Sequence, residues 1–129
     1  MLENKDYCDY ETCVALKELG ITDWSLQYYE KGCPNTLHRN LFQPLTIRTA
    51  EALGRVLAIS LYYAQKWLRE EKKIEIVVHS FDYVGEPYFA DIHMYREVRC
   101  ACSYADSYEE ALSKGIKEAV EILKDGIGE

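Results

Sequence analysis

This chain of 129 residues carries 22 acidic and 15 basic side chains, which gives a formal net charge of −7 at pH 7. Its Lys and Arg residues are scattered in runs of two at most, so it lacks the concentrated basic face that binding to nucleic-acid phosphates requires. An apolar content of 48% is enough to bury a core without disulfides or metals. We therefore expect a single domain, residues 1–129, that does not bind nucleic acid.

The beginning of the chain, MLENKDYCDYE, is acidic and lacks the basic and apolar segments of a secretory signal. The longest uncharged run, Val56 to Gln65, is too short to span a membrane. The cysteines, at positions 8, 13, 33, 100 and 102, have neither zinc-finger nor redox spacing. We therefore expect a cytoplasmic protein with free thiols, no cofactor and no contact with membranes.

The N-terminal half opens with a helical pattern. Asp9 is a good N-cap, the apolar residues up to Leu19 share one helical face, and Gly20 followed by an apolar residue is typical of a helix end. Alternation then predicts a short strand from Trp24 to about Tyr29, followed by a turn at Gly32, Pro34 and Asn35. Residues 36–47 fit neither period and are either a second short strand or an ordered loop.

Helical spacing returns at residue 49, where Thr49 is a candidate N-cap, and continues to Leu68. The pattern allows one long helix or two pieces. Ser60, preceded by Ile59, resembles a fresh N-cap with an apolar staple, so two pieces broken near Ala58 to Ser60 are favoured. In the second piece, Leu61, Ala64 and Leu68 form the seam expected to be buried.

After Lys73 the period changes to two, which predicts a β-hairpin. Apolar residues occupy even positions in both strands, Ile74 to Val78 and Ala90 to Val98. A three-residue loop, Gly85 to Pro87, keeps both sets on one face. With Val84 opposite Tyr88, this register predicts that His79 lies opposite His93.

The two predicted histidine neighbours form the candidate site for chemistry. With Asp82 and Asp91 nearby, His79 and His93 could hold a divalent metal or perform acid–base work. Partly covered structural histidines are the favoured alternative, and His38 is given no role. The same outer face carries Phe81, Tyr83 and Tyr95, which we interpret as a protein interaction surface because Tyr offers contact area together with one polar group.

Cys100 and Cys102 continue the even positions, so a strand running to about Ser103 would point both thiols into the core. A Cys-x-Cys pair can contribute to a zinc site, but buried apolar cysteines are favoured here. Ser107 to Glu110 then form a capping box that opens a helix ending at Gly126, in which Gly115 lies on the apolar side and predicts close approach to the sheet.

Two stretches, AQKWLREEKKIEI and SYEEALSKGIKEAVEIL, resemble small uncharacterised proteins of Bacteroides-type bacteria, their phages and mobile elements. These share a WLRE helix, a strand pair and a terminal helix of the form YEEALxxGIxEAL, and the resemblance covers Ser60 to Lys124. It implies this element order and no catalytic residues. Relatives often carry Gly or Asn where this chain has Lys73, at the end of the first helix.

Together these patterns predict an α+β domain. An antiparallel sheet of about three strands has two main helices, Ser60 to Lys72 and Tyr108 to Lys124, packed on one face, and an N-terminal helix is added. The favoured function is a non-enzymatic interaction protein, with a homodimer as one form. The alternatives are a metal-binding protein or metal-dependent enzyme centred on His79 and His93, and a small-ligand binder in the gap between the N-terminal half and the sheet.

Overall fold

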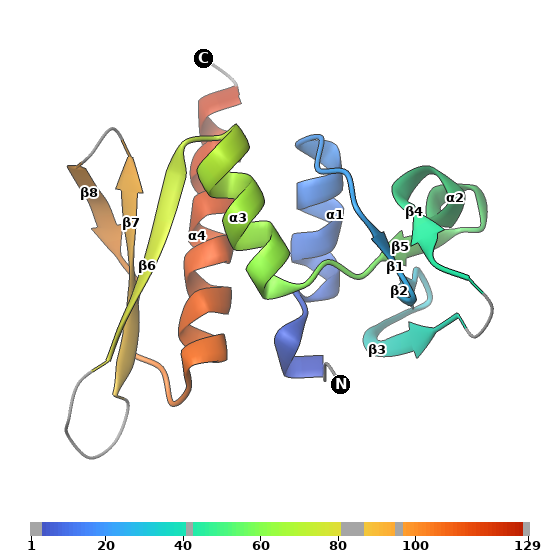
Figure 1. The fold of residues 1–129 in the computed structure, drawn as a ribbon, viewed down its shortest axis with the longest axis horizontal. Coiled ribbons are helices and arrows are strands. Elements are labelled where there is room, and N and C mark those ends of the chain that lie inside the picture. The colour runs from blue at the N-terminus through green and yellow to red at the C-terminus, as the bar shows by residue number, and fades with distance from the viewer. Residues whose placement is uncertain (1–3, 41–42, 81–86, 95–96, 128–129) are drawn as a thin grey trace. The chain divides into compact units, whose positions relative to one another are not determined.

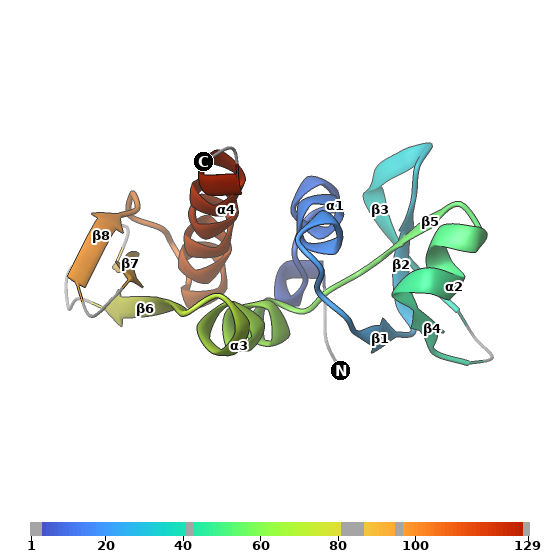
Figure 2. The ribbon, with the colours of Figure 1, turned by 90° about the horizontal axis from the view of Figure 1, so that it is seen from above.

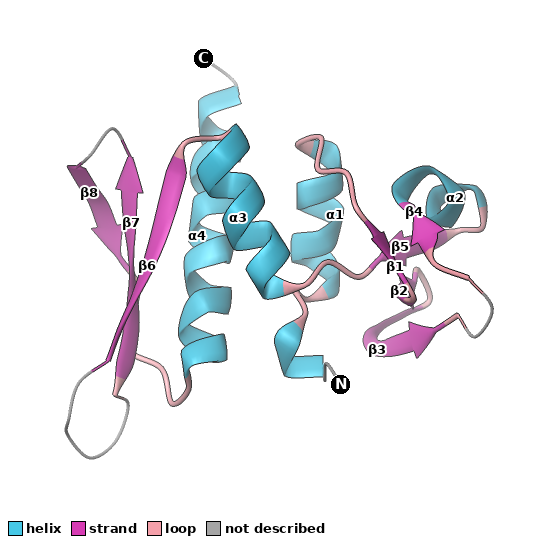
Figure 3. Cartoon of the chain, viewed as in Figure 1, coloured by secondary structure: helices cyan, strands magenta, loops and turns pink. Residues whose placement is uncertain are grey.

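The computed structural model describes residues 4–40, 43–80, 87–94 and 97–127. The chain forms two compact units, Met1–Ser60 and Leu61–Glu129, and each contains both helices and antiparallel strands (Figure 3). The fold is therefore α+β, as the sequence predicts. The expectation of a single domain stays a prediction, because two such units occur both inside one domain and as separate domains.

The N-terminal unit begins with a short 3₁₀ turn, Asn4–Asp6, and helix α1, Tyr10–Glu18. The Asp9 side chain accepts a hydrogen bond from the Thr12 amide at 2.9 Å, which confirms the predicted N-cap. Gly20 has φ = +100°, and the Ile21 amide donates to the Leu16 carbonyl at 3.1 Å, so the helix ends as the Gly–Ile pair predicts.

The strands of this unit form two small antiparallel sheets (Figure 1). Strand β1, Trp24–Ser25, pairs with β4, Leu45–Thr46, and β2, Gln27–Glu30, lies between β3, Cys33–Arg39, and β5, Arg55–Leu57. The predicted turn at Pro34 and Asn35 is wrong, since both lie in β3 and the chain turns one step earlier, at residues 31–32. Pro is tolerated there because β3 is an edge strand.

Helix α2, Ile47–Ala52, corrects the prediction for this segment. Thr46, rather than Thr49, caps the helix by accepting a hydrogen bond from the Thr49 amide at 3.1 Å. Gly54 then adopts φ = +74°, which stops the helix and allows the chain to enter β5. The helical spacing across residues 55–57 is therefore misleading. The core of this part combines residues from four elements: Tyr28, Leu45, Ala50 and Leu57.

The C-terminal unit is a three-stranded sheet with two helices on one face. Helix α3, Leu61–Glu71, is followed by β6, Ile74–Ser80, β7, Tyr88–Met94, β8, Glu97–Ala101, and helix α4, Tyr108–Ile127. The sheet order is β6-β7-β8. Both helices lie on the same side of this sheet in two views (Figure 1 and Figure 2). This part of the predicted fold is confirmed, including the break before Leu61.

Helix α3 covers a backbone acceptor on one edge of the sheet, strand β6. The Cys102 amide donates to the Ala90 carbonyl, so the even residues of β7 direct their backbone groups toward β8 and the odd ones toward β6. In β6, consequently, the even residues direct their backbone N–H and C=O groups away from β7, toward the outer edge of the sheet. The Gln65 side-chain amide donates to the Ile76 carbonyl there at 2.9 Å. One acceptor of this edge is therefore occupied by the protein's own helix.

Helix α4 packs its small residues closely on the sheet. The Glu110 amide donates to Ser107 Oγ at 3.1 Å, so the predicted cap is confirmed, and the Glu110 carboxylate accepts from the Asp106 amide at 3.2 Å. A Cβ on Gly115 would lie 2.6 Å from Ile76 Cγ2, which confirms the predicted close approach. The helix runs to Ile127, past the predicted end at Gly126.

Candidate functional site

The candidate site lies on the face of the β6-β7-β8 sheet opposite the helices, which we call the open face. The predicted pairing of its histidines is wrong: His79 lies opposite Phe89, and His93 lies opposite Glu75. Tyr88 pairs with Ser80 rather than with Val84, so the register assumed from the three-residue loop is wrong. Both registers have the same parity, which is why the faces were predicted correctly while the partners were not.

Asp91 nevertheless brings the two histidines together. His79 Nε2 lies 2.8 Å from Asp91 Oδ2 and hydrogen-bonds to it, and His93 Nε2 lies 3.9 Å from the same oxygen. The His79 and His93 side chains are 40% and 29% exposed, and Asp91 is 16% exposed. His93 Nε2 is buried and makes no hydrogen bond to any residue that the structure describes. The result is a carboxylate on β7 with one imidazole, His93, on the same strand and the other, His79, on the neighbouring strand β6.

The donor set does not resemble a metal centre in the described ranges. No group of three or more His, Cys, Asp or Glu side chains in residues 4–40, 43–80, 87–94 and 97–127 is arranged to hold a metal ion. The 2.8 Å separation of His79 and Asp91 is a hydrogen-bond distance, and two ligands of one ion would instead each point at a shared central position. The three predicted candidates are thus neighbours, with a hydrogen bond between His79 and Asp91, while His93 Nε2 lies 3.9 Å from the same carboxylate oxygen.

Aromatic rings continue the open face beyond the histidines. His79 stacks on Phe89 with 4.7 Å between ring centroids, and Phe89 meets Tyr104 edge-on at 5.6 Å. Tyr104 is 45% exposed. The predicted interaction residues Phe81, Tyr83 and Tyr95, and also Asp82, lie outside the described residues. Phe89 and Tyr104 were not singled out by the sequence pattern: Phe89 has the parity of the open face in either register, but only the observed register places it opposite His79.

A β-bulge adds Val98 to the same face. The predicted single run from Tyr88 to Ser103 is in fact two antiparallel strands, β7 and β8, and the pairing slips where Ile92 meets Cys100 and His93 meets Val98. The extra residue turns Val98 from the predicted core face to the open face, where it is 58% exposed. The open face thus carries Val98 and Tyr104 as exposed apolar groups on either side of the His–Asp–His cluster.

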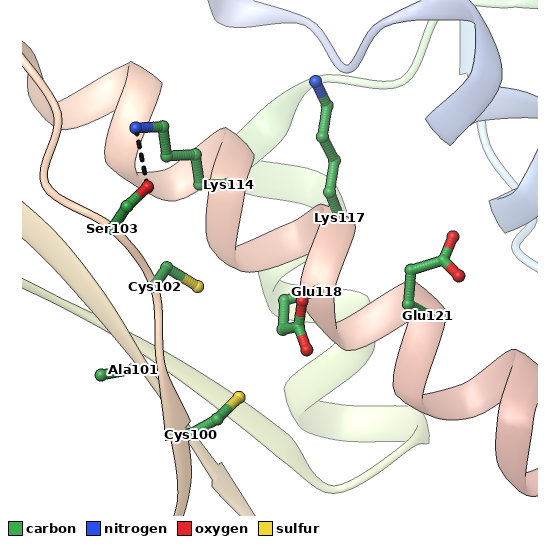
Figure 4. A pocket seen from close by; sticks show the side chains of 8 residues that line it. All are labelled: Cys100, Ala101, Cys102, Ser103, Lys114, Lys117, Glu118 and Glu121. Atoms are coloured by element: carbon green, nitrogen blue, oxygen red, sulfur yellow. Dashed lines mark hydrogen bonds between the residues drawn. The ribbon is translucent and has the colours of Figure 1, made fainter.

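The Cys-x-Cys pair lies on the helix side of β8, and its predicted burial is wrong. Cys100 and Cys102 are only half-buried, because they line an open groove of about 430 Å³ between the end of β8 and α4 (Figure 4). Burial is the main cause that raises the pKa of both thiols, to about 11 for Cys102. Both are therefore protonated at neutral pH and are poor nucleophiles.

The N-terminal unit holds its own polar cluster. The Tyr29 hydroxyl donates to the Cys8 carbonyl at 2.7 Å, and the Ile59 amide donates to Cys13 Sγ at 3.4 Å. Burial raises the pKa of Tyr29 far above its usual value. His38 stacks on Tyr28 with a centroid distance of 5.4 Å. These contacts join α1, β2 and the end of β5 and have a structural role.

No protein-family model matches this chain, and comparison with curated proteins and with solved structures found no match. In the part of the chain that the structure describes, none of the helices has the length and apolar character needed to cross a membrane.

Proposed function

We propose that this protein is a small non-enzymatic interaction protein that works inside the cell and uses the open face of its C-terminal sheet to bind a second copy of itself. One observation carries this proposal: both α3 and α4 occupy the other face, while the open face presents Val98 and Tyr104 at 58% and 45% exposure. Exposed apolar groups beside polar ones are typical of a contact surface.

The size of the face sets the expected affinity. With strands about 4.8 Å apart and residues about 3.3 Å apart, three strands present roughly 300 Å² in projection. A standard interface buries about 800 Å² on each partner. We therefore expect weak, concentration-dependent association, with a dissociation constant of roughly micromolar or above.

Sedimentation velocity over a concentration series tests this proposal. Tyr104→Lys places a charge in the open face and should abolish dimers. Tyr62→Lys, on α3, is the matched control, because Tyr62 is also 45% exposed but lies on a helix away from the face. Monomers at every concentration, or equal loss of dimers in both variants, would refute the proposal.

The alternative function, a metal-binding protein or metal-dependent enzyme, is supported by the approach of both histidine Nε2 atoms to Asp91 Oδ2. Native mass spectrometry after incubation with zinc addresses it. An added mass of one zinc that disappears in the double variant His79→Ala, His93→Ala would support this function; the bare chain mass would argue against it. Small-ligand binding stays a further prediction.

The origin of the chain is part of the proposal. The stretches WLREEK and YEEALSKGIKEAVEIL support a common origin with the small proteins of Bacteroides-type bacteria, their phages and mobile elements.

A further inference from the structure

The groove between β8 and α4 is a second surface, separate from the open face. Its strand wall is formed by residues 100–103, and its helix wall by four charged side chains of α4: Lys114, Lys117, Glu118 and Glu121. Figure 4 shows the two thiols of the strand wall turned toward α4. An edge strand beside a helix leaves a trough in which an extended chain can lie.

The backbone of β8 offers free hydrogen-bonding groups along this trough. The Cys102 amide donates to Ala90 across the sheet, at 2.8 Å. Because backbone groups of successive strand residues point in opposite directions, the N–H and C=O of Ala101 point away from β7. Among the strands that the structure describes, β8 pairs with β7 alone. Ala101 can therefore both donate to and accept from an added strand.

The groove has a basic end and an acidic end. Lys114 Nζ donates to Ser103 Oγ at 3.1 Å and to the Tyr104 carbonyl at 2.6 Å, and it lies 3.9 Å from Glu110 Oε1, so its ammonium is held near Ser103. Lys117 comes about one turn after Lys114 on α4, with its amine directed away from the strand wall, and Glu118 and Glu121 follow it along the helix (Figure 4). Glu118 contributes to raising the pKa of both Cys100 and Cys102, so its charge acts beside the thiols.

The strand wall between these ends is small and uncharged. Cys100, Ala101 and Cys102 are short side chains, and both thiols are protonated at neutral pH because burial raises their pKa. Short neutral side chains let a second backbone approach the edge closely. The charged ends would then select the direction in which the added chain runs.

We propose that this groove binds an extended peptide segment of a protein partner by strand addition to β8, with an acidic peptide side chain at the Lys114 and Lys117 end and a basic one at the Glu118 and Glu121 end. This inference goes beyond self-association through the open face and does not depend on it. The peptide supplies a fourth strand, and the charge order supplies specificity.

The first experiment is selection of a phage-displayed library of random linear dodecapeptides on the full-length protein. Enriched peptides should combine alternating β-forming residues with one acidic and one basic position. Fluorescence polarisation with the best labelled peptide then measures affinity. If no peptide is enriched, or if the enriched peptides lack this charge order, the proposal is overturned.

Two substitutions at Ala101 distinguish the contribution of the backbone N–H to peptide binding from that of the side chain. Ala101→Pro removes the outward N–H, and Ala101→Val keeps it while adding a β-forming side chain. We expect the peptide affinity to fall about tenfold or more with Pro and to change little with Val. Equal affinity for both variants would contradict strand addition. Circular dichroism establishes that the Pro variant is folded.

A charge-swapped variant keeps the test decisive even if Ala101→Pro does not fold. The double substitution Lys117→Glu, Glu121→Lys reverses part of the polarity without changing the net charge, and it places Glu four residues before Lys, which suits a helix. This variant should bind the original peptide more weakly and should bind more tightly a peptide in which the acidic and basic positions are exchanged. Unchanged selectivity would refute the charge order.

Self-association provides the last distinction. If Ala101→Pro, and not Tyr104→Lys, abolishes dimers in the absence of peptide, the added strand belongs to a second copy and the partner-peptide form of the inference is wrong. If Tyr104→Lys abolishes dimers and leaves peptide binding intact, the two surfaces are independent, as we infer.

Discussion

Replacing Gly115 with Ala is the sharpest stability test of the C-terminal unit. In an exposed helix this change stabilises by about 1 kcal/mol, because Ala loses less backbone freedom on folding. Here the new Cβ would lie 2.6 Å from Ile76 Cγ2 and 3.1 Å from Ala90 Cβ. Ile76 and Ala90 are fully buried, and the β-branched Ile76 has few alternative rotamers, so neither can move away at low cost.

The two effects can be compared in magnitude. Overpacking of a core costs about 1–3 kcal/mol, and the short distance to Ile76 places this clash near the upper end of that range. After the helical gain of about 1 kcal/mol is subtracted, the free energy of unfolding should fall by about 1–2 kcal/mol. For a unit of this size that lowers Tm by roughly 5–15 °C.

Urea denaturation followed by circular dichroism measures this loss, with Glu121→Ala on the exposed side of α4 as the control. A double-mutant cycle with Ile76→Ala, which removes the clashing methyl group, should recover most of the loss caused by Gly115→Ala. If Gly115→Ala stabilises the protein by about 1 kcal/mol, the close packing of α4 on β6 is refuted.

Three further predictions follow from local geometry. Lys73 adopts φ = +59°, so Lys73→Gly should stabilise the protein by about 1 kcal/mol in urea denaturation, and a loss of stability would contradict the left-handed helix end. Ser107→Ala removes the cap of α4 and should cost about 1 kcal/mol, whereas no change in the urea midpoint would show that the cap contributes little. With its pKa raised to about 11, Cys102 should react with iodoacetamide more slowly than exposed Cys33 at neutral pH, and its rate should rise about tenfold per pH unit until the pKa is reached; mass spectrometry of the labelled peptides would refute this if Cys102 reacted first.

The sequence predicts faces better than it predicts partners. Alternation assigned Ile76 and Ile92 to the core and His79 and His93 to the open face, because the period of a strand is local. The partner of His79 depends on where the chain re-enters the sheet after Ser80, and periodicity carries no signal for that position. A single extra residue in β8 turned Val98 outward, since a bulge reverses the parity after it.

Helix boundaries were predictable where the capping residue lay outside a continuous apolar pattern. Asp9 and Ser107 were identified correctly, and the break before Leu61 followed from Ser60. In contrast, Gly54 was overlooked as a stop signal inside an unbroken apolar stripe, so β5 was missed. Gly54 adopts φ = +74° without the steric cost that a side chain would bring, and so ends the helix although the apolar spacing continues past it.

The hydrogen bond from the Gln65 side chain to the Ile76 carbonyl makes the two edges of the C-terminal sheet unequal. Sheets that expose two open edges can recruit one strand after another and build fibres. In this sheet one edge carries a side-chain amide from α3, and the other, β8, accepts a strand. Strand addition to this sheet is therefore expected at β8 rather than at β6, where the Ile76 carbonyl is already bonded.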